Sequence, residues 1–153
     1  MPDPRVAKLA DVLITHSTRL QPGEKILIEA FDAPDEIVTA LIERAAQAGG
    51  VPFVETRSNK VLRSLYTYGT AEQMQTIGDH ELARMKEMDA YIGLRGSQNA
   101  LELADVPAEK MNLYQKHWWR TVADQRVNHT KWVVLRYPSP AFAQAAGMST
   151  EQF

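Results

Sequence analysis

Four short apolar runs along the chain predict β-strands. They cover residues 26–28, 51–54, 90–94 and 132–135. The first run is continuous rather than alternating, which favours a strand covered on both faces, as in a parallel sheet. Pro52 stands at the beginning of the second run, where its missing backbone N–H is tolerable.

Longer stretches between these runs repeat their apolar residues at the helical period. The first begins with Asp3 as N-cap and Pro4 at the first helical position, and the second begins at Pro34. Residues 70–73 have capping-box spacing, and a further helix is predicted from 107 to about 126. The residues expected to face the core are Val6, Leu9, Ala10, Leu13, Ile14, Ile37, Ala40, Leu41, Ala45, Met74, Ile77, Leu82, Met85, Met88, Met111, Tyr114, Trp118 and Val122.

The alternation of strands and helices defines the predicted fold class. Strands separated by helices of this length favour a three-layer α/β/α domain, whose sheet is mainly parallel and has about four or more strands. The stretch from the first strand to the second reads as a βαβ unit, and such crossovers are nearly always right-handed. Two complete cores would be cramped in 153 residues, so we expect one domain, 1–153.

Composition and charge exclude several classes of protein. Hydrophobic residues at 44% and charged residues at 24% are ordinary for a soluble globular domain. A net charge of −2 provides no strong field for attracting nucleic acid, so no nucleic-acid partner is expected. The lack of cysteine fits a reducing cytoplasm, and no apolar stretch resembles a signal peptide or membrane span. We therefore expect a cytoplasmic location and no membrane partner.

The histidines and carboxylates lack the spacing of a hydrolytic metal site. Such a site needs about three or four convergent His, Asp or Glu ligands. The four histidines are far apart in sequence, and Arg84 replaces the second histidine that an H-E-x-x-H motif beginning at His80 would need. We interpret Asp79, His80 and Glu81 as a solvated polar helix face. The prediction is no catalytic residue and no metal ligand in this chain.

Arginines recur where the predicted strands end. Arg57, Arg95 and Arg136 follow the second, third and fourth strands, and ligands of open α/β folds gather at that edge. Three guanidinium groups there could hold a peptide carboxylate or meet acidic side chains of another domain. The simpler interpretation is that they are solvated strand ends. As the substrate-binding hypothesis we assign Arg95 together with Ser97 and Asn99 of the loop that follows.

Three tryptophans require separate interpretations. Trp118 and Trp132 fall on predicted core faces, where packing explains them. Adjacent helical positions point about 100° apart, so Trp118 and Trp119 cannot both face one core without a wide apolar stripe. We therefore predict that Trp119 lies at an interface, with another domain or with a dimer partner.

The last residues of the chain have the pattern of a helix start, but the sequence ends before a helix could be completed. Residues 139–146 read as a short helix, and residues 149–152 have capping-box spacing immediately before Phe153. Because a single helical turn is unstable alone, this ending favours an incomplete fragment of a longer protein. The alternative is a polar tail that matches a loose pattern by chance.

A long segment near the end of the chain resembles a known family. Residues 131–144 read KWVVLRYPSPAFAQ and, with residues 146–151, resemble the aminopeptidase T and aminopeptidase S family. Weaker similarity covers residues 22–25, 48–52, 96–99 and 102–107. The resemblance extends over essentially the whole chain, which would be the N-terminal portion of a longer enzyme.

The resemblance implies a metallo-aminopeptidase that uses two divalent ions of the zinc, cobalt or magnesium type. It also implies a peptide substrate, a homodimer and metal ligands in a C-terminal domain that these 153 residues do not include. No position here matches that ligand motif, so the chain alone is expected to be inactive and to shape the substrate cavity. Two alternatives are a self-contained flavodoxin-like module for a small anionic ligand and a purely structural interaction domain.

Overall fold

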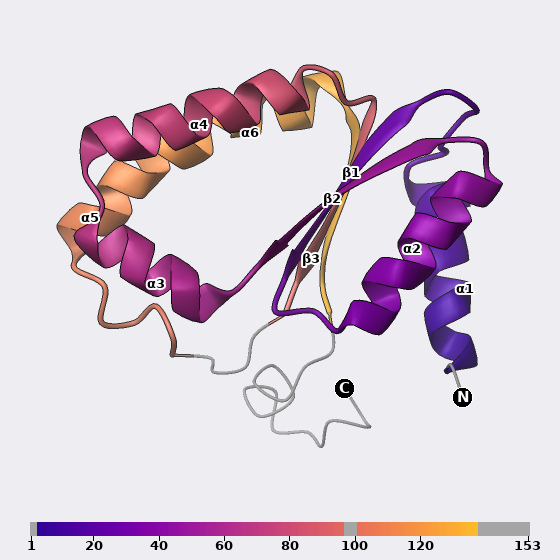
Figure 1. Ribbon diagram of the computed structural model, residues 1–153, viewed down its shortest axis with the longest axis horizontal. Helices are drawn as coiled ribbons and strands as arrows, with labels where there is room; N and C mark the ends of the chain where they lie inside the picture. The colour runs from indigo at the N-terminus through magenta and orange to yellow at the C-terminus, as the bar shows by residue number, and fades with distance from the viewer. Residues whose placement is uncertain (1–2, 97–100, 138–153) are drawn as a thin grey trace.

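The structure, a computed structural model, describes residues 3–96 and 101–137 of the chain. Four parallel strands lie between two groups of helices, which confirms the predicted three-layer α/β class (Figure 1). The elements, in chain order, are α1 (Pro4–Val12), η1 (Leu13–Ser17), β1 (Lys25–Phe31), α2 (Asp35–Gln47), β2 (Val51–Arg57), α3 (Asn59–Tyr68), α4 (Ala71–Met85), β3 (Ala90–Arg95), α5 (Ala108–Leu113), η2 (Tyr114–Trp119), α6 (Arg120–His129) and β4 (Lys131–Arg136).

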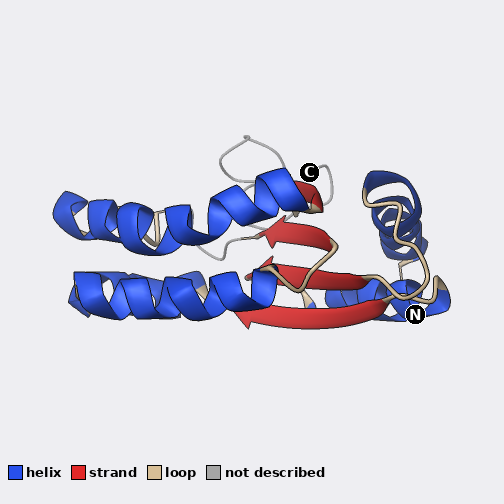
Figure 2. Cartoon of the chain, turned by 90° about the horizontal axis from the view of Figure 1, so that it is seen from above, coloured by secondary structure: helices blue, strands red, loops and turns tan. Residues whose placement is uncertain are grey.

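The sheet has the order β2-β1-β3-β4, and every neighbouring pair is parallel. Each strand includes the apolar run that predicted it and extends past that run by at least one residue. β1 is buried except at its two end residues, as its continuous apolar run predicts, because helices cover both sides of the sheet (Figure 2).

Strand register sorts the side chains onto two faces of the sheet. Successive side chains of a strand point to opposite faces, so Ile28 and Glu29 belong to different layers. Ile28 pairs with Ile92 of β3, and Glu29 pairs with Glu55 of β2 and Gly93 of β3. We call the face that carries Ile28 and Ile92 the aliphatic face, and the face that carries Glu29 and Glu55 the charged face.

The aliphatic face packs against α1, η1 and α2. Its core is built from small and branched apolar side chains, each buried to at least nine-tenths: Ala10, Leu13, Ile14, Leu20, Ile26, Ile28, Ala30, Ile37, Val38, Leu41, Ala45, Ala90, Ile92 and Leu94. Burying each large aliphatic side chain contributes on the order of 1.5–3 kcal/mol. The apolar stripes predicted for the first two helices are therefore confirmed as core.

The charged face is covered by the helices that follow β2 and β3. α3, α5 and η2 enclose one aromatic cluster that includes Tyr66 and Trp118, while Met85, Tyr91 and Val122 belong to a second cluster nearer the sheet. Figure 1 shows α4 and α6 leaning away from the strands and joining α3 and α5 in an arch. Among the described residues, no helix is both long and apolar enough to cross a membrane.

The order of the strands reverses beside β1. The connection from β1 to β2 runs through α2 on the aliphatic face, whereas β2 reaches β3 through α3 and α4 on the charged face. β1 and β3 are therefore neighbours whose chains leave toward opposite faces. In doubly wound sheets, ligands bind at the carboxyl ends of two such strands.

Two helical features shape the layer over the charged face. Thr70 and Gln73 form the predicted reciprocal capping box at the start of α4. The helix predicted from 107 to 126 is confirmed, but its centre, η2, has the wider π-helical turn, which the apolar spacing did not predict. At Gly78, an added Cβ would lie 2.8 Å from the carbonyl oxygen of His117, so α4 approaches η2 closely only because residue 78 is glycine.

Candidate functional site

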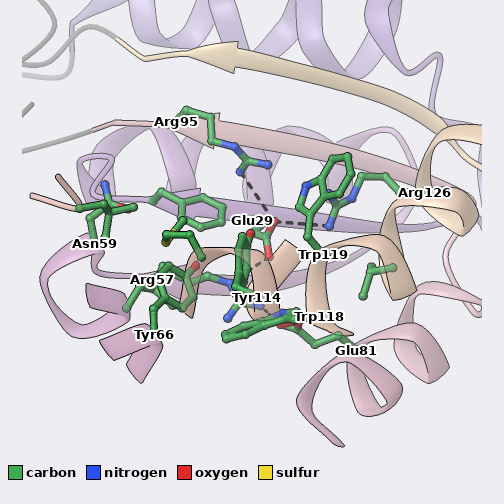
Figure 3. Close-up of a pocket in the computed structure, with 15 residues that line it drawn as sticks. Glu29, Arg57, Asn59, Tyr66, Glu81, Arg95, Tyr114, Trp118, Trp119 and Arg126 are labelled. Carbon is green, nitrogen blue, oxygen red and sulfur yellow. Dashed lines mark hydrogen bonds and ion pairs between the residues drawn. The ribbon is translucent and has the colours of Figure 1, made fainter. Parts of the chain in front are cut away.

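A cavity of about 220 Å³ lies between the charged face of the sheet and the helical arch (Figure 3). The carboxyl halves of β1, β2 and β3 form its floor, so it lies beside the point where the strand order reverses. Its lining combines charged, aromatic and aliphatic side chains: Glu29, Phe31, Arg57, Asn59, Leu62, Tyr66, Glu81, Arg95, Leu103, Met111, Tyr114, Trp118, Trp119, Val122 and Arg126.

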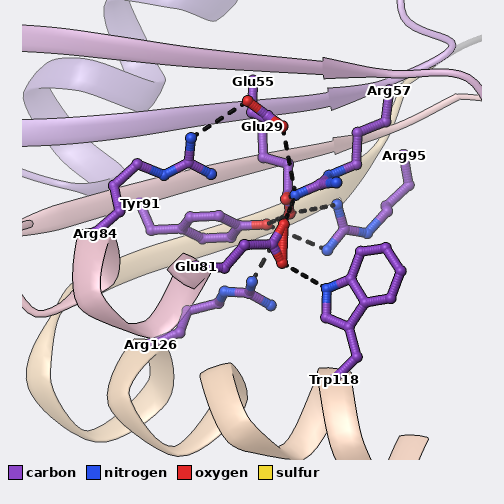
Figure 4. Close-up of polar contacts among 9 residues, drawn as sticks. All are labelled: Glu29, Glu55, Arg57, Glu81, Arg84, Tyr91, Arg95, Trp118 and Arg126. Carbon is purple, nitrogen blue, oxygen red and sulfur yellow. Dashed lines mark hydrogen bonds and ion pairs between the residues drawn. The ribbon is translucent and has the colours of Figure 1, made fainter. Parts of the chain in front are cut away.

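Glu29 is the central charge of this cavity, and only 6% of its side chain is exposed. One carboxylate oxygen accepts a hydrogen bond from Nε of Arg57 at 2.9 Å, and the other accepts from the Tyr91 hydroxyl at 2.6 Å. Guanidinium nitrogens of Arg95 and Arg126 lie 3.7 and 3.8 Å from that second oxygen (Figure 4). Two strands, β2 and β3, and helix α6 thus direct donors and positive charge at one carboxylate of β1.

The surroundings of Glu29 keep it ionised. Burial on its own would raise the pKa of this carboxyl, because desolvation disfavours the charged form. The positive charge of Arg57, the Tyr91 hydrogen bond, and the charges of Arg126 and Arg95 outweigh that effect and hold the pKa of Glu29 below its usual range. Glu29 is therefore a fixed negative charge at neutral pH.

Two more glutamates extend the ionic network toward α4. Glu81 accepts hydrogen bonds from the Arg57 guanidinium and from the indole N–H of Trp118. Glu55 accepts from Arg84 at 3.2 Å and lies 3.8 Å from Arg57. Each of the three carboxylates in the network therefore has an arginine partner.

The Tyr91 hydroxyl reaches Glu29 because Gly93, the next residue of β3 on the same face, has no side chain. Tyr91 and Gly93 lie on the same face of β3, and a Cβ added at Gly93 would be 2.8 Å from the Tyr91 hydroxyl oxygen. Burial, together with the adjacent carboxylate of Glu29, raises the pKa of Tyr91, so its hydroxyl keeps its proton and donates it to the hydrogen bond.

Aromatic rings form the wall of the cavity opposite the sheet. The rings of Tyr66 and Tyr114 have centroids 4.4 Å apart, and Trp118 packs edge-on against Tyr114 with centroids 5.4 Å apart. Burial raises the pKa of both tyrosines, so both remain neutral. The wall is therefore uncharged and apolar apart from two hydroxyl groups and the indole N–H that is bonded to Glu81.

Two of the arginines contact aromatic rings and also have a guanidinium nitrogen that donates no hydrogen bond to the described residues. The guanidinium carbon of Arg95 lies 4.2 Å from the centre of the Phe31 ring, and that of Arg126 lies 4.3 Å from the centre of the Tyr91 ring. Nη1 of Arg95 and Nε of Arg126 are buried and have no hydrogen-bond partner among the described residues. Both arginines therefore retain hydrogen-bonding capacity after their contacts with Glu29.

The described residues do not form a metal site. Within residues 3–96 and 101–137, no group of three or more His, Asp or Glu side chains is close enough together to hold a metal ion. The carboxylates of the cavity, Glu29 and Glu81, are paired with arginines whose positive charges would repel a divalent cation. The chemistry of this cavity suits anions rather than metals.

The structure brings together two of the three predicted rim arginines. Arg57 and Arg95 both contact Glu29, while Arg136 lies beside Arg95 in the register of β3 and β4. The interpretation of Arg57 as a solvated strand end is wrong, because its side chain is only 12% exposed and reaches inward to the buried carboxylate. Ser97 and Asn99, the other substrate-binding candidates, lie outside the described residues, as do the helix predicted over 139–146 and the capping box at 149–152.

Several side chains differ from their sequence-based interpretations. Glu81 is not part of a solvated face, since it bonds Arg57 and Trp118 inside the cavity. Trp118 is buried as predicted, but Trp132 is 44% exposed on β4, the last strand in the sheet of the described residues. Trp119 is 46% exposed, as a residue at an interface would be, and lines the cavity together with Trp118; its contact with another domain or a dimer partner stays a prediction.

Sequence reasoning missed Glu29 and Arg126, although both had a signal. Glu29 interrupts an apolar stretch that resumes with Ala30 and Phe31, and a charge inside a buried strand needs a buried partner. Trp118 and Val122 of the predicted core stripe are four residues apart, and Arg126 follows Val122 at the same spacing, one turn further along the helix.

Comparison with known proteins gives one family and one shared fold. The family model described as thermophilic metalloprotease (M29) matches residues 3–153. The structure of wild-type AmpT from Thermus thermophilus superposes with a TM-score of 0.75 and 20% sequence identity, covering 97% of this chain and 40% of that chain. The chain thus spans well under half the length of AmpT, and the likeness shows a shared fold.

Other comparisons add little. A crystal structure of CurK enoyl reductase gives a TM-score of only 0.39 at 17% identity, covering 93% of this chain and 44% of that chain. No curated protein matches the chain.

Proposed function

This chain belongs to the thermophilic metalloprotease (M29) family, and from that membership we propose that it works within a metal-dependent aminopeptidase that releases N-terminal residues from peptides. The match over residues 3–153 is the observation that carries the proposal. The fold shared with AmpT supports it, since 97% of this chain superposes. The family match does not favour the alternative of a self-contained flavodoxin-like module.

In the proposed division of labour, this domain forms a wall of the substrate cavity and other residues of the enzyme hold the metals. The carboxylates of the charged face support this division, because Glu29, Glu55 and Glu81 each have an arginine partner. Withdrawing Glu29 to bind a metal would leave Arg95 and Arg126 without the carboxylate that they share, which is costly. Arg95, Ser97 and Asn99 remain our proposed contacts for the peptide substrate.

The partners of the enzyme are also proposals. We propose a cytoplasmic homodimer that uses two divalent ions and contains a C-terminal catalytic domain. The large apolar side chains of Trp119 and Trp132 are 46% and 44% exposed, which supports a contact between this domain and another domain or subunit. Trp119 is the residue we assign to that contact.

The direct test is a peptidase assay of the 153-residue chain, with and without the rest of the enzyme. Leucyl arylamide hydrolysis is measured with added Co²⁺ or Zn²⁺, and equilibrium dialysis measures metal bound per chain. We expect no turnover and no stoichiometric metal for the chain alone, and metal-dependent turnover for a longer polypeptide that includes the catalytic domain. A chelator-treated sample of the longer polypeptide serves as control.

Two results would contradict the proposal in different ways. Metal-dependent turnover by the 153 residues alone would overturn the division of labour while leaving the family activity intact. A longer polypeptide that binds metal and yet hydrolyses no aminoacyl arylamide or peptide would overturn the aminopeptidase activity itself.

A further inference from the structure

We propose that the cavity on the charged face is a binding site for a small organic monocarboxylate with an apolar body. The proposal goes beyond peptide hydrolysis because it concerns a ligand that the residues of this domain bind by themselves. It concerns the cavity lined by Glu29, Arg95, Arg126 and the aromatic wall (Figure 3).

The charge of the cavity favours a single negative charge in the ligand. Three arginines and two glutamates line it, so the lining carries one net positive charge. Including Glu55 and Arg84, which complete the ionic network, leaves that balance unchanged. A buried charge without compensation is unfavourable, and one carboxylate in the cavity would neutralise it.

The unused donors favour a carboxylate as the carrier of that charge. Arg95 and Arg126 lie 3.7 and 3.8 Å from the same oxygen of Glu29, which is longer than a hydrogen bond. Nη1 of Arg95, the nitrogen nearest Glu29, and Nε of Arg126 have no acceptor within hydrogen-bond distance among the residues described here. A guanidinium has five N–H donors in a planar fork that matches a carboxylate, so a ligand carboxylate can bind alongside Glu29.

The remaining lining selects an apolar body of limited size. Leu62, Tyr66, Met111, Tyr114 and Val122 provide aromatic and aliphatic surface next to the arginines. The volume of about 220 Å³ leaves room for the branched hydrocarbon body of a short acid beside the arginines. An inorganic anion would leave this surface without contacts.

Binding is tested by calorimetric titration of the 153-residue chain with 4-methylpentanoate, 4-methylpentanamide, leucine, acetate and inorganic phosphate. We expect saturable binding of 4-methylpentanoate at one site per chain. The neutral amide should bind at least about tenfold more weakly, since it loses a charge-assisted hydrogen-bonded pair. Leucine should also bind more weakly, because its ammonium group would meet a net positive lining.

Variants locate the ligand in the cavity. Arg126→Gln should weaken binding of 4-methylpentanoate by about 10- to 100-fold, the range for a lost hydrogen bond between charged groups. The matched control is Arg120→Gln, which removes an exposed arginine of the same helix that does not line the cavity, and its affinity should be unchanged. Met111→Trp keeps every charge and fills the cavity, so it should abolish binding even where Arg126→Gln perturbs folding.

Several outcomes would overturn the proposal. Failure of 4-methylpentanoate to bind would do so, as would equal affinity for the acid and its amide or for the acid and phosphate. Tighter binding of leucine than of 4-methylpentanoate would also overturn it. So would binding that survives both Arg126→Gln and Met111→Trp. Because the titration involves no metal and no hydrolysis, its failure is distinguishable from a failure of the peptidase assay.

Discussion

The two faces of the central sheet are buried by the same strands but are stabilised by different means. On the aliphatic face, Ile28 and Ile92 pack in a layer of branched side chains that needs only shape and volume. On the charged face, Glu29 is buried to a similar degree but requires Arg57 and Tyr91 at fixed positions. A burial pattern alone does not distinguish these two kinds of interior.

Because of this difference, one face of the sheet contributes mainly to stability, while the other face also forms the binding cavity. Volume-conserving exchanges among hydrophobic residues are usually tolerated in a core, so the aliphatic face should accept them. The charged face should not, because removing a charged member of the network leaves the buried charges that it contacts with less compensation. The cavity lies only on the charged face, where the sheet and the arch of helices fail to close completely.

The largest expected effect comes from removing the central carboxylate. Glu29→Leu should reduce the free energy of unfolding by about 3–5 kcal/mol, because Arg57, Arg95 and Arg126 lose their shared counter-ion. Urea-induced unfolding followed by circular dichroism measures it. Glu87→Leu, at an exposed position, is the matched control and should change stability by no more than about 0.5 kcal/mol. Equal small changes for both variants would show that the network contributes no stability.

The next largest effect is a truncation on the aliphatic face. Ile92→Ala should cost about 3 kcal/mol, because it leaves a cavity at a fully buried position. Ile92→Val, which removes one methylene, should cost only about 0.5–1.5 kcal/mol in the same urea titration. If the valine variant were as damaging as the alanine variant, the aliphatic face would depend on more than filled volume.

A smaller effect is expected at the glycine beneath the tyrosine hydroxyl. Gly93→Ala should cost about 2 kcal/mol, since the added methyl would displace the Tyr91 hydroxyl from Glu29. In a Tyr91→Phe background the same change should cost less, because the atom nearest the methyl is gone. Additive losses in the double variant would contradict this explanation.

The smallest effect is the acid sensitivity of the charged face. The pKa of Glu29 is lower in the folded chain than its ordinary value of 4.5, so its ionisation stabilises the fold at neutral pH. That contribution declines as the pH falls below about 4.5 and is lost below the folded-state pKa. Glu29→Gln should therefore unfold with a weaker dependence on pH, and its stability should converge with that of the unmodified chain in acid. Parallel curves down to the lowest pH would contradict the assignment.

The sequence predicted the fold better than the cavity. The strands and the α4 capping box depend on neighbours within a few residues, and such local signals are readable from spacing alone. Glu29 and Arg126 meet only through tertiary packing, so neither residue indicates its partner in the sequence. The π-helical turn of η2 was also not readable from the apolar spacing, and both Trp118 and Trp119 of this turn line the cavity.

Glu29 and the residues that contact it come from four separate stretches of chain, and this dispersion has a consequence for biosynthesis. Glu29 leaves the ribosome early, whereas Arg126 leaves only after most of the domain has been made. During that interval the carboxylate lacks part of its positive surroundings, so the charged face of β1 is not yet stabilised, whereas its aliphatic face can already pack. Contacts between segments distant in the sequence form slowly because a long loop must close first. We therefore expect the aliphatic face to assemble before the charged face, and the cavity to take shape last.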